Sequence, residues 1–169
     1  MRGLIVLGLF LTGFPACSEQ VAEPKMVMGV RCNQDFVLLT GRVVDEADLL
    51  TSDQEQRIEV TLASLEENTR HQFVVATVTT LQGKSIDDYS NCLANHWGIG
   101  RKGLNDGIVL VVAPIEGKVR IQTGLGLERA LTDNEALKIM DDKIIPAFKS
   151  GKMAKGIEIG VAEIIMEIS

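Results

Sequence analysis

The chain has 169 residues and a formal net charge of −6, with 46% hydrophobic and 24% charged residues. This composition is ordinary for a globular protein, and the length suits one domain that buries about two-thirds of the surface of its unfolded chain. The acidic balance argues against a nucleic-acid partner, because phosphate binding needs a basic footprint and the 17 Lys and Arg are spread along the sequence. An excess of acid favours cation binding instead.

Residues 1–17 are typical of an export signal. Arg2 gives a positive start, and residues 4–14 form an apolar run that is too short to span a bilayer, which favours a secretory signal peptide. The letters FPAC resemble a bacterial lipobox, in which Cys17 would become the diacylated first residue of a lipoprotein; cleavage after Ser18 is the alternative. We therefore expect an exported protein, periplasmic or held to the membrane only through an N-terminal lipid anchor.

The remaining cysteines form an even pair. If Cys17 is lipidated or removed, Cys32 and Cys92 are left in an oxidising compartment, where disulfides persist. A bridge between them would close a loop of about 61 residues and stabilise the fold by about 4 kcal/mol in the chain-entropy model. Two unrelated thiols are the alternative.

The pattern of the chain predicts a tether followed by one domain. Residues 18–35 show no sustained periodicity and contain Pro24 and Gly29, so we interpret them as a tether, and the domain covers residues 36–169. Along the domain we expect, in order, a strand, a helix, a strand, a helix, a hairpin and two helices. This order predicts an α/β domain with helices on both faces of a mixed sheet.

The first half of the domain contains two expected helices. One covers residues 51–69, where Ser52 and Glu55 have the spacing of a capping box and an apolar stripe follows. The other covers residues 85–97, with Ser85 as its N-cap and a glycine at its end. Between them, QFVVATVTT is a β-branched apolar run, which is typical of a strand covered on both faces.

The second half contains the expected hairpin and two further helices. GIVLVVAP is another central-strand pattern, and KVRIQTG alternates polar and apolar residues, as in an antiparallel neighbour. Thr132 and Glu135 form a second capping box, for a helix that we expect to bend or break near Pro146 and to stop at Gly151. The last helix covers residues 152–168.

Sequence motifs for known catalytic chemistry are missing. The chain lacks GxSxG, HExxH and GxxxxGK[ST], each of which would place a nucleophile, a metal or a phosphate at fixed geometry. His71 and His96 are the only imidazoles, and we interpret both as surface or capping residues. A His-based mechanism is therefore not favoured, and no catalytic residue is assigned.

Carboxylates gather instead in the loops where strands and helices meet. These residues are Asp45, Glu46, Asp48, Asp87, Asp88, Asp106 and Glu128. Oxygen-rich loops suit hard cations such as Ca²⁺, which takes about six to eight oxygen ligands. The candidate Ca²⁺ ligands are Asp45, Asp48, Asp88, Asp106 and Glu128. As the alternative, Asp87 and Asp88 complement a helix dipole and the others are solvated turn residues.

The stretch WGIGRKGLNDG has the composition of a phosphate loop. Its order is helix, loop, strand, whereas a phosphate loop follows a strand and opens a helix. We therefore interpret Gly98, Gly100 and Gly103 as cap and turn glycines. Asp106 is the residue of this stretch that we expect to act, because it stands at the mouth of a central strand.

Four segments together resemble the TPM domain family over roughly residues 40–168. They are VVDEADLL, IDDYSNCLANHWGIGRKGLNDGIVLVVAP, KVRIQTGLGLE and IIPAFKSGKMAKGI, in that order. The resemblance implies a three-layer α/β/α sandwich around a short mixed sheet. Thylakoid-lumen members of the family are described as acid phosphatases tied to photosystem II repair, and others bind Ca²⁺. Bacterial members are mostly exported or membrane-anchored proteins without an assigned reaction.

Two function classes follow. The first is an exported, calcium-binding, non-catalytic domain that assists the assembly or repair of an envelope complex, with an envelope or membrane protein as its partner. The alternative is a metal-assisted acid phosphatase acting on phosphomonoesters. In that case clustered Asp residues would hold a divalent ion, and Arg101 or Arg120 would offset the phosphate charge.

Overall fold

The computed structural model describes residue 32 and residues 35–169. The predicted leader, Cys17 and the tether up to residue 31 lie outside the described residues, so the export and lipidation predictions stay predictions. In the part of the chain that is described, none of the helices combines the length and the apolar character of a membrane span.

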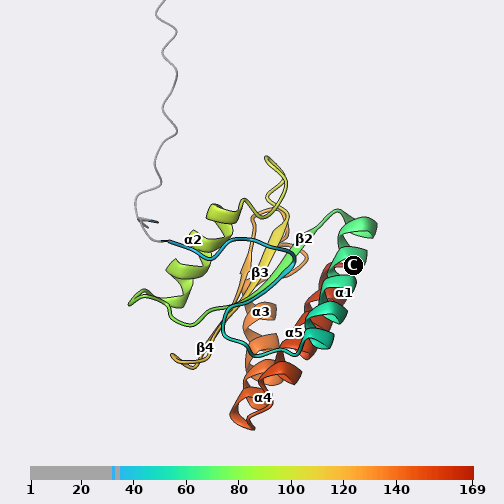
Figure 1. The fold of residues 1–169 in the computed structure, drawn as a ribbon. Coiled ribbons are helices and arrows are strands. Elements are labelled where there is room, and N and C mark those ends of the chain that lie inside the picture. Colours follow the sequence, from blue (N-terminus) through green and yellow to red (C-terminus); the bar gives the residue numbers. More distant parts are fainter. Residues whose placement is uncertain (1–31, 33–34) are drawn as a thin grey trace, which may run out of the picture.

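Four strands form one mixed sheet in the order β1-β2-β3-β4 (Figure 1). They are β1 (Val43–Asp45), β2 (Gln72–Thr77), β3 (Gly107–Ala113) and β4 (Lys118–Thr123). The first three strands are parallel to one another, and β4 returns antiparallel to β3, which confirms the predicted hairpin. Every residue of β3 is buried, because the strand has a neighbour on each side and helices above and below.

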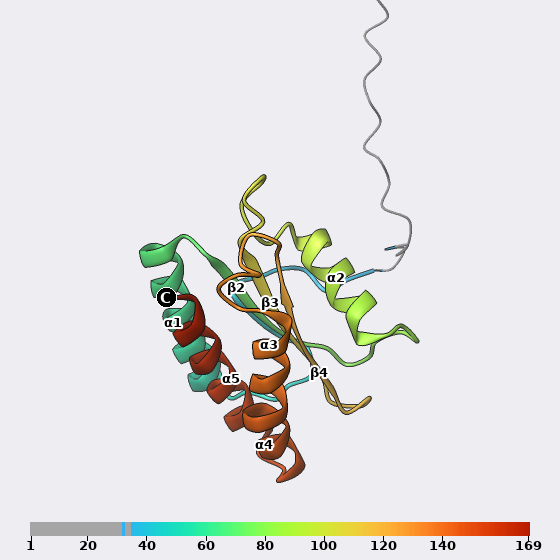
Figure 2. The ribbon, with the colours of Figure 1, turned by 180° about the vertical axis from the view of Figure 1, so that it is seen from behind.

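Helices cover both faces of the sheet, as expected for the fold class. The helices α1 (Ser52–Thr69), α3 (Asp133–Ile139) and α5 (Met153–Ile168) lie on one face, and α2 (Ile86–Trp97) lies on the other (Figures 1 and 2). Alternate residues of β3 divide between two cores. Leu110 packs with the α1 and α5 residues, while Val109 packs with Tyr89 and Leu93 of α2. The chain is thus an α/β domain built in three layers.

The two parallel connections leave the sheet toward opposite faces. Both β1-α1-β2 and β2-α2-β3 advance in the same direction across the sheet, but α1 and α2 cover different faces. The two crossovers therefore have opposite hand, and one departs from the right-handed rule. The connections after β1 and β2 therefore diverge at the carboxyl edge of the sheet, the first toward α1 and the second toward α2.

The caps of the helices agree with the sequence except at α1. Its N-cap is Thr51, whose side chain accepts from the Gln54 amide, so the capping box is Thr51–Gln54 and the predicted pair Ser52–Glu55 is wrong by one residue. Thr51 has extended backbone dihedrals, as an N-cap does, whereas Ser52 is already part of the helix. The second predicted box, at Thr132, is confirmed.

The helix that was expected to bend near Pro146 changes its winding there. A π-helical stretch, η1 (Met140–Ile144), separates α3 from the short α4 (Ile145–Lys149). The amide of Ile145 donates to the carbonyl of Met140, five residues back. A proline has no amide hydrogen and its ring crowds the preceding turn, so a wider turn is a local way to accommodate it.

A disulfide joins Cys32 to Cys92 of α2, with 5.3 Å between their Cα atoms, which confirms the predicted pairing. From there residues 35–42 cross α2 and lead into β1. Phe36 packs against Tyr89, with ring centroids 5.4 Å apart, and the indole of Trp97 donates to the carbonyl of Val37 at 2.9 Å. The segment therefore packs along one side of α2 and adds Phe36 to the core between α2 and the sheet.

Candidate functional site

The five predicted calcium ligands lie at two opposite edges of the sheet. Asp45 ends β1 and Asp106 precedes β3, and because these strands are parallel the two residues lie at the carboxyl and the amino edge respectively. Asp48 and Asp88 follow Asp45 to the carboxyl edge, whereas Glu128 lies beyond β4 at the amino edge. Within the described residues no three His, Cys, Asp or Glu side chains form a group that could hold a metal. The expected single cluster is therefore corrected to two separate groups.

At the amino edge, Asp106 is buried and bound by Arg101. Its carboxylate accepts from the Arg101 backbone amide at 2.8 Å and from Nε at 2.7 Å, and it forms an ion pair with Nη2. Burial alone would raise the pKa of Asp106, but the hydrogen bonds from Arg101 outweigh it and hold the pKa below its ordinary value. His71 Nδ1 stands 3.7 Å away. Asp106 therefore closes the loop before β3, and the guanidinium of Arg101 is paired with the Asp106 carboxylate.

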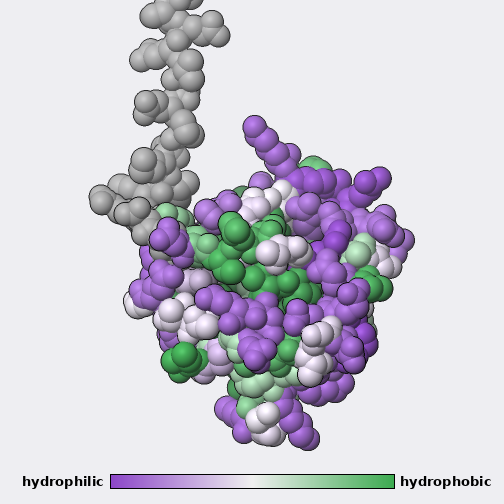
Figure 3. All heavy atoms as spheres, in the orientation of Figure 1, coloured by the Kyte–Doolittle hydropathy of each residue, from purple (hydrophilic) through white to green (hydrophobic). Residues whose placement is uncertain are grey.

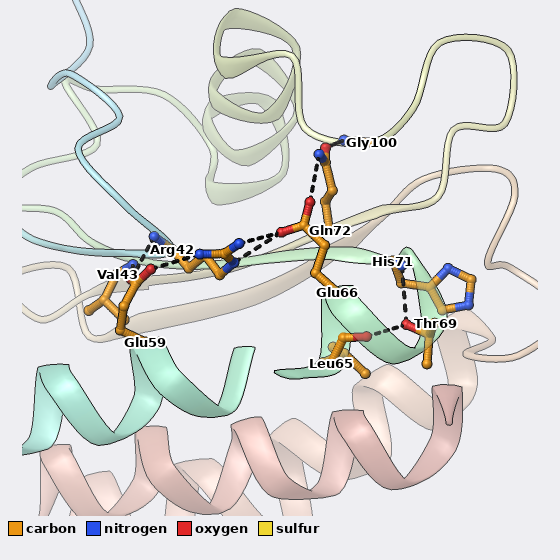
Figure 4. Close-up of polar contacts among 9 residues, drawn as sticks. All are labelled: Arg42, Val43, Glu59, Leu65, Glu66, Thr69, His71, Gln72 and Gly100. Atoms are coloured by element: carbon orange, nitrogen blue, oxygen red, sulfur yellow. Dashed lines mark hydrogen bonds and ion pairs between the residues drawn. The ribbon is translucent and has the colours of Figure 1, made fainter. Parts of the chain in front are cut away.

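A second polar network at this edge ties β1 to α1 (Figure 4). The guanidinium of Arg42 donates to Glu66 Oε2 at 2.8 and 3.0 Å and to Glu59 Oε1 at 3.0 Å. Gln72 extends the network, because its amide donates to Glu66 at 3.2 Å and accepts from the backbone of Gly100 at 2.8 Å. Sequence reasoning missed these residues. The available signal was the seven-residue spacing of the two glutamates, which puts both on one face of α1.

At the carboxyl edge, Asp45 shapes the loop that leads into α1. One carboxylate oxygen accepts from the Leu49 amide at 3.1 Å and from the Thr77 hydroxyl, and the other accepts from the Leu50 amide at 2.8 Å. Both oxygens are thus engaged by the protein. Asp45 thus fixes the path of the loop, and the carboxylate of its neighbour Glu46 accepts from the hydroxyl of Thr79, just after β2.

Two glutamates from different loops contact the segment that follows β2. Glu46 Oε1 accepts from the Thr79 hydroxyl at 3.1 Å, and Glu116 Oε1 accepts from the Leu81 amide at 2.8 Å and from the Thr80 hydroxyl at 3.2 Å. The second oxygen of Glu116, Oε2, is enclosed and has no hydrogen-bond partner among the described residues. Glu116 lies in the β3–β4 turn. The sequence analysis predicted the hairpin but did not identify Glu116 as a candidate ligand.

The pKa of the Tyr89 hydroxyl reflects the charges at this edge. Burial, followed by the charges of Glu46 and Glu116, raises the pKa of its hydroxyl to about 12. The amide of Leu81 is the main cause that holds the pKa of Glu116 below its ordinary value. The carboxyl edge therefore holds a buried phenol that stays neutral well above its ordinary pKa.

The second arginine predicted for phosphate binding is also paired. Arg120 Nε lies 3.2 Å from Asp87 Oδ1, which joins β4 to the first turn of α2. Asp88, in the same turn, is exposed, and its backbone amide donates to Ser85, the predicted N-cap. Each of the two arginines thus has a carboxylate of the chain as its counter-ion.

Comparison with known proteins gives one family and several structures of the same fold. The family model described as TPM domain matches residues 43–167. The solution structure of the N-terminal domain of a Porphyromonas protein (P. gingivalis) is 34% identical, covers 76% of this chain and 82% of that chain, and superposes with a TM-score of 0.71. No curated protein matches the chain.

Two more distant structures share the fold alone. BA42 from the psychrophilic bacterium Bizionia argentinensis is 20% identical, with 70% of this chain and 81% of that chain covered and a TM-score of 0.61. The N-terminal domain of cg2496 from Corynebacterium glutamicum is 14% identical, with 83% and 88% covered and a TM-score of 0.60.

Proposed function

The chain belongs to the TPM domain family, and from that premise we propose that it is a non-catalytic domain that binds a calcium ion at the carboxyl edge of its sheet. Glu46 and Glu116 are the proposed acidic ligands. The observation that carries the proposal is the enclosed Glu116 Oε2, which has no hydrogen-bond partner in the described part of the chain. A buried carboxylate oxygen without a donor is costly, and a bound cation would offset that cost.

The surroundings of these carboxylates suit a hard cation. The site would lie at the carboxyl edge, where the connections after β1 and β2 leave toward opposite faces, and open α/β sheets commonly bind ligands at such a place. The hydroxyls of Thr79 and Thr80 already lie against the two carboxylates and offer neutral oxygen ligands. Calcium accepts such mixed sets of carboxylate, hydroxyl, carbonyl and water oxygens. When bound, the ion would supply positive charge that links the β1–α1 loop to the β3–β4 turn.

The arrangement favours binding over phosphate chemistry. A phosphatase needs cationic groups that are free to meet the phosphoryl oxygens. Arg101 and Arg120 are instead paired with Asp106 and Asp87, so neither is free in this conformation. The expected role in the assembly or repair of an envelope complex would use the calcium-linked loop and turn as a contact surface.

Calorimetric titration of the full chain with CaCl₂ tests the proposal. Glu116→Gln and Glu46→Gln should each weaken calcium binding by about tenfold or more, because each removes one ligand charge. Glu128→Gln is the matched control, since it makes the same change at the opposite edge, and it should leave the affinity unchanged. Mg²⁺ should bind more weakly, because it requires a tighter octahedral shell.

Two outcomes would contradict the proposal. An absence of binding heat with wild-type protein would remove calcium from the function, and a loss of affinity in Glu128→Gln but not in Glu116→Gln would move the site to the amino edge. Hydrolysis of a phosphomonoester by the calcium-loaded protein, lost on Arg120→Gln, would favour the phosphatase alternative.

A further inference from the structure

A pocket of about 470 Å³ opens beside β4, at the edge of the sheet opposite to β1. Among the described residues β4 is the last strand of the sheet, so no further strand fills the space between the two helical layers at this edge. In Figure 2, β4 lies between α2 on one side and α3 and α4 on the other. The pocket is formed where the β3–β4 hairpin approaches the start of α2 and the turn from α4 to α5.

The apolar lining of this pocket comes from both layers. Ile86 packs against the core under α2, whereas the other large apolar residues of the lining pack against the core on the opposite face: Val119, Ile145, Phe148 and Met153. A Cβ atom at Gly156 would stand 2.6 Å from Cε1 of Phe148, so the absence of a side chain there lets the Phe148 ring lie against α5. Figure 3 shows hydrophobic surface around α4, with hydrophilic side chains beside it.

Two lysines line the same pocket. Lys118 begins β4 and Lys149 ends α4, and both residues are exposed. The lysine ion pairs of the described residues are made by Lys143 and Lys155 instead. Glu116, in the adjoining turn, offsets part of the charge of Lys118. In a chain with a net charge of −6, an apolar pocket bordered by two lysines favours an anionic ligand.

We propose that this pocket binds an anionic amphiphile with a single acyl chain, a long-chain carboxylate, whose chain lies along the apolar lining and whose carboxylate pairs with Lys118 and Lys149. The volume falls in the range of small-molecule sites, about 300–1,000 Å³. A peptide would bring N–H and C=O groups into the apolar lining, where they would lose their hydration, whereas an acyl chain has none to lose. The pocket is independent of the proposed calcium site, because neither Glu46 nor Glu116 lines it.

NMR of the full chain, labelled with ¹³C in its methionine methyl groups, gives the first test. The probe is dodecanoate, added below its micelle concentration and with EDTA, so that no calcium salt forms. The Met153 methyl signal should shift and saturate with a Kd of about 100 μM or tighter. Met166 is 66% exposed and lies outside the lining, so its signal should stay in place. An unmoved Met153 signal, or equal shifts of both signals, would overturn the proposal.

The chemistry of the ligand is tested by a series of probes. From octanoate to dodecanoate each added CH₂ should tighten binding by about fourfold until the pocket is full, because each buries more apolar surface. Dodecyltrimethylammonium has the same chain but a positive head group, and it should bind about tenfold more weakly or worse, because the two lysines repel it. Equal affinity for the cation and the carboxylate would contradict the anionic ligand.

Lysine variants test the position of the carboxylate. Lys118→Gln and Lys149→Gln should each weaken dodecanoate binding by about threefold, which is the size of effect expected for an exposed charge pair. Both residues are exposed, so the fold should persist, and thermal melts check that it does. Lys102→Gln is the matched control, because Lys102 is an exposed lysine outside the lining, and it should bind like the wild type. Equal affinities of all three variants would refute the assignment.

Other occupants of the pocket would be recognised by the same Met153 signal. Co-sedimentation of the protein with phosphatidylglycerol vesicles, without a Met153 shift by free dodecanoate, would indicate a membrane surface. A Met153 shift caused by an acetylated and amidated hexapeptide of alternating glutamate and valine, but not by dodecanoate, would indicate a partner peptide. A shift that rises with protein concentration alone, together with a dimer in sedimentation, would indicate a second copy. Each of these results would overturn the assignment to an amphiphile.

Discussion

The carboxylate of Asp106 is held by Arg101, five residues earlier in the chain, which donates to it from both its backbone amide and its guanidinium. This contact folds the glycine-rich loop back on the entrance of β3. The loop that resembled a phosphate site in composition is thus organised around a carboxylate of the chain, which agrees with its interpretation as a turn.

Asp106→Asn should destabilise the protein. The substitution removes charge-assisted hydrogen bonds at a buried position, at a cost of about 1.5–3 kcal/mol. For a domain of this size each kcal/mol lowers the melting temperature by roughly 2–4 °C. Thermal melts of Asp106→Asn and of the exposed control Asp48→Asn check this; equal melting temperatures would contradict it.

The same residue should contribute to acid unfolding. The pKa of Asp106 is lowered from 3.8 in the folded state, so its contribution to stability is fully present above that value and is lost as the pH falls through the lower folded pKa. Urea unfolding at a series of pH values should therefore show a steeper loss of stability below pH 3.8 for the wild type than for Asp106→Asn. Parallel curves for the two proteins would refute the assignment.

Tyr89 offers an optical test of the carboxyl edge, because it is the only tyrosine in the chain. Its tyrosinate absorbance should titrate near pH 12, against 10.0 for a free tyrosine, and its contribution to stability should be lost as the pH rises from 10.0 through about 12. Glu46→Gln or Glu116→Gln should lower this pKa in part, since burial remains. Bound calcium should lower it for the same electrostatic reason. Titration of the folded protein at the free value would contradict both the burial of Tyr89 and the nearby charges.

Reduction of the Cys32–Cys92 disulfide should lower the free energy of unfolding by up to about 4 kcal/mol, because the bridge closes a loop of about 61 residues. Calorimetric melts with and without reductant measure the effect. Cys32→Ser should melt like the reduced wild type and should not respond to reductant, while Cys17→Ser should respond as the wild type does. Free thiols at both positions in the untreated protein, found by alkylation and mass spectrometry, would contradict the bridge.

The order of helices and strands along the chain, the hairpin and the caps of the second and third helices could be predicted from local patterns, whereas the grouping of the acids could not be predicted from loop position alone. Asp45 and Asp106 both border a strand, but one follows its strand and the other precedes it. In a parallel sheet that difference puts them at opposite edges. The sequence pattern already predicted the order of strands and helices. It could therefore have shown that Asp45 and Asp106 do not lie at the same edge.

Glu116 and Glu59 were beyond sequence reasoning for a different reason. Glu116 approaches the end of β2 because the β3–β4 turn stands beside residues 80 and 81, and Glu59 reaches the backbone of β1 from a helix that starts nine residues after the strand begins. Both contacts depend on how elements pack in space. Propensity and periodicity give the elements and the face that each buries, but they do not give the distance between two polar side chains.

The disulfide also decides how the domain would bear mechanical load. Tension applied to the chain ahead of Cys32 passes through the sulfur atoms directly to Cys92 in α2. Residues 33–91, which include the three-residue edge strand β1, then carry none of the force transmitted to any attachment point after Cys92. Without the bridge, the same pull would act on β1 and peel it from β2 first. Oxidation of this cysteine pair thus moves the point of loading from the weakest strand of the sheet to a helix.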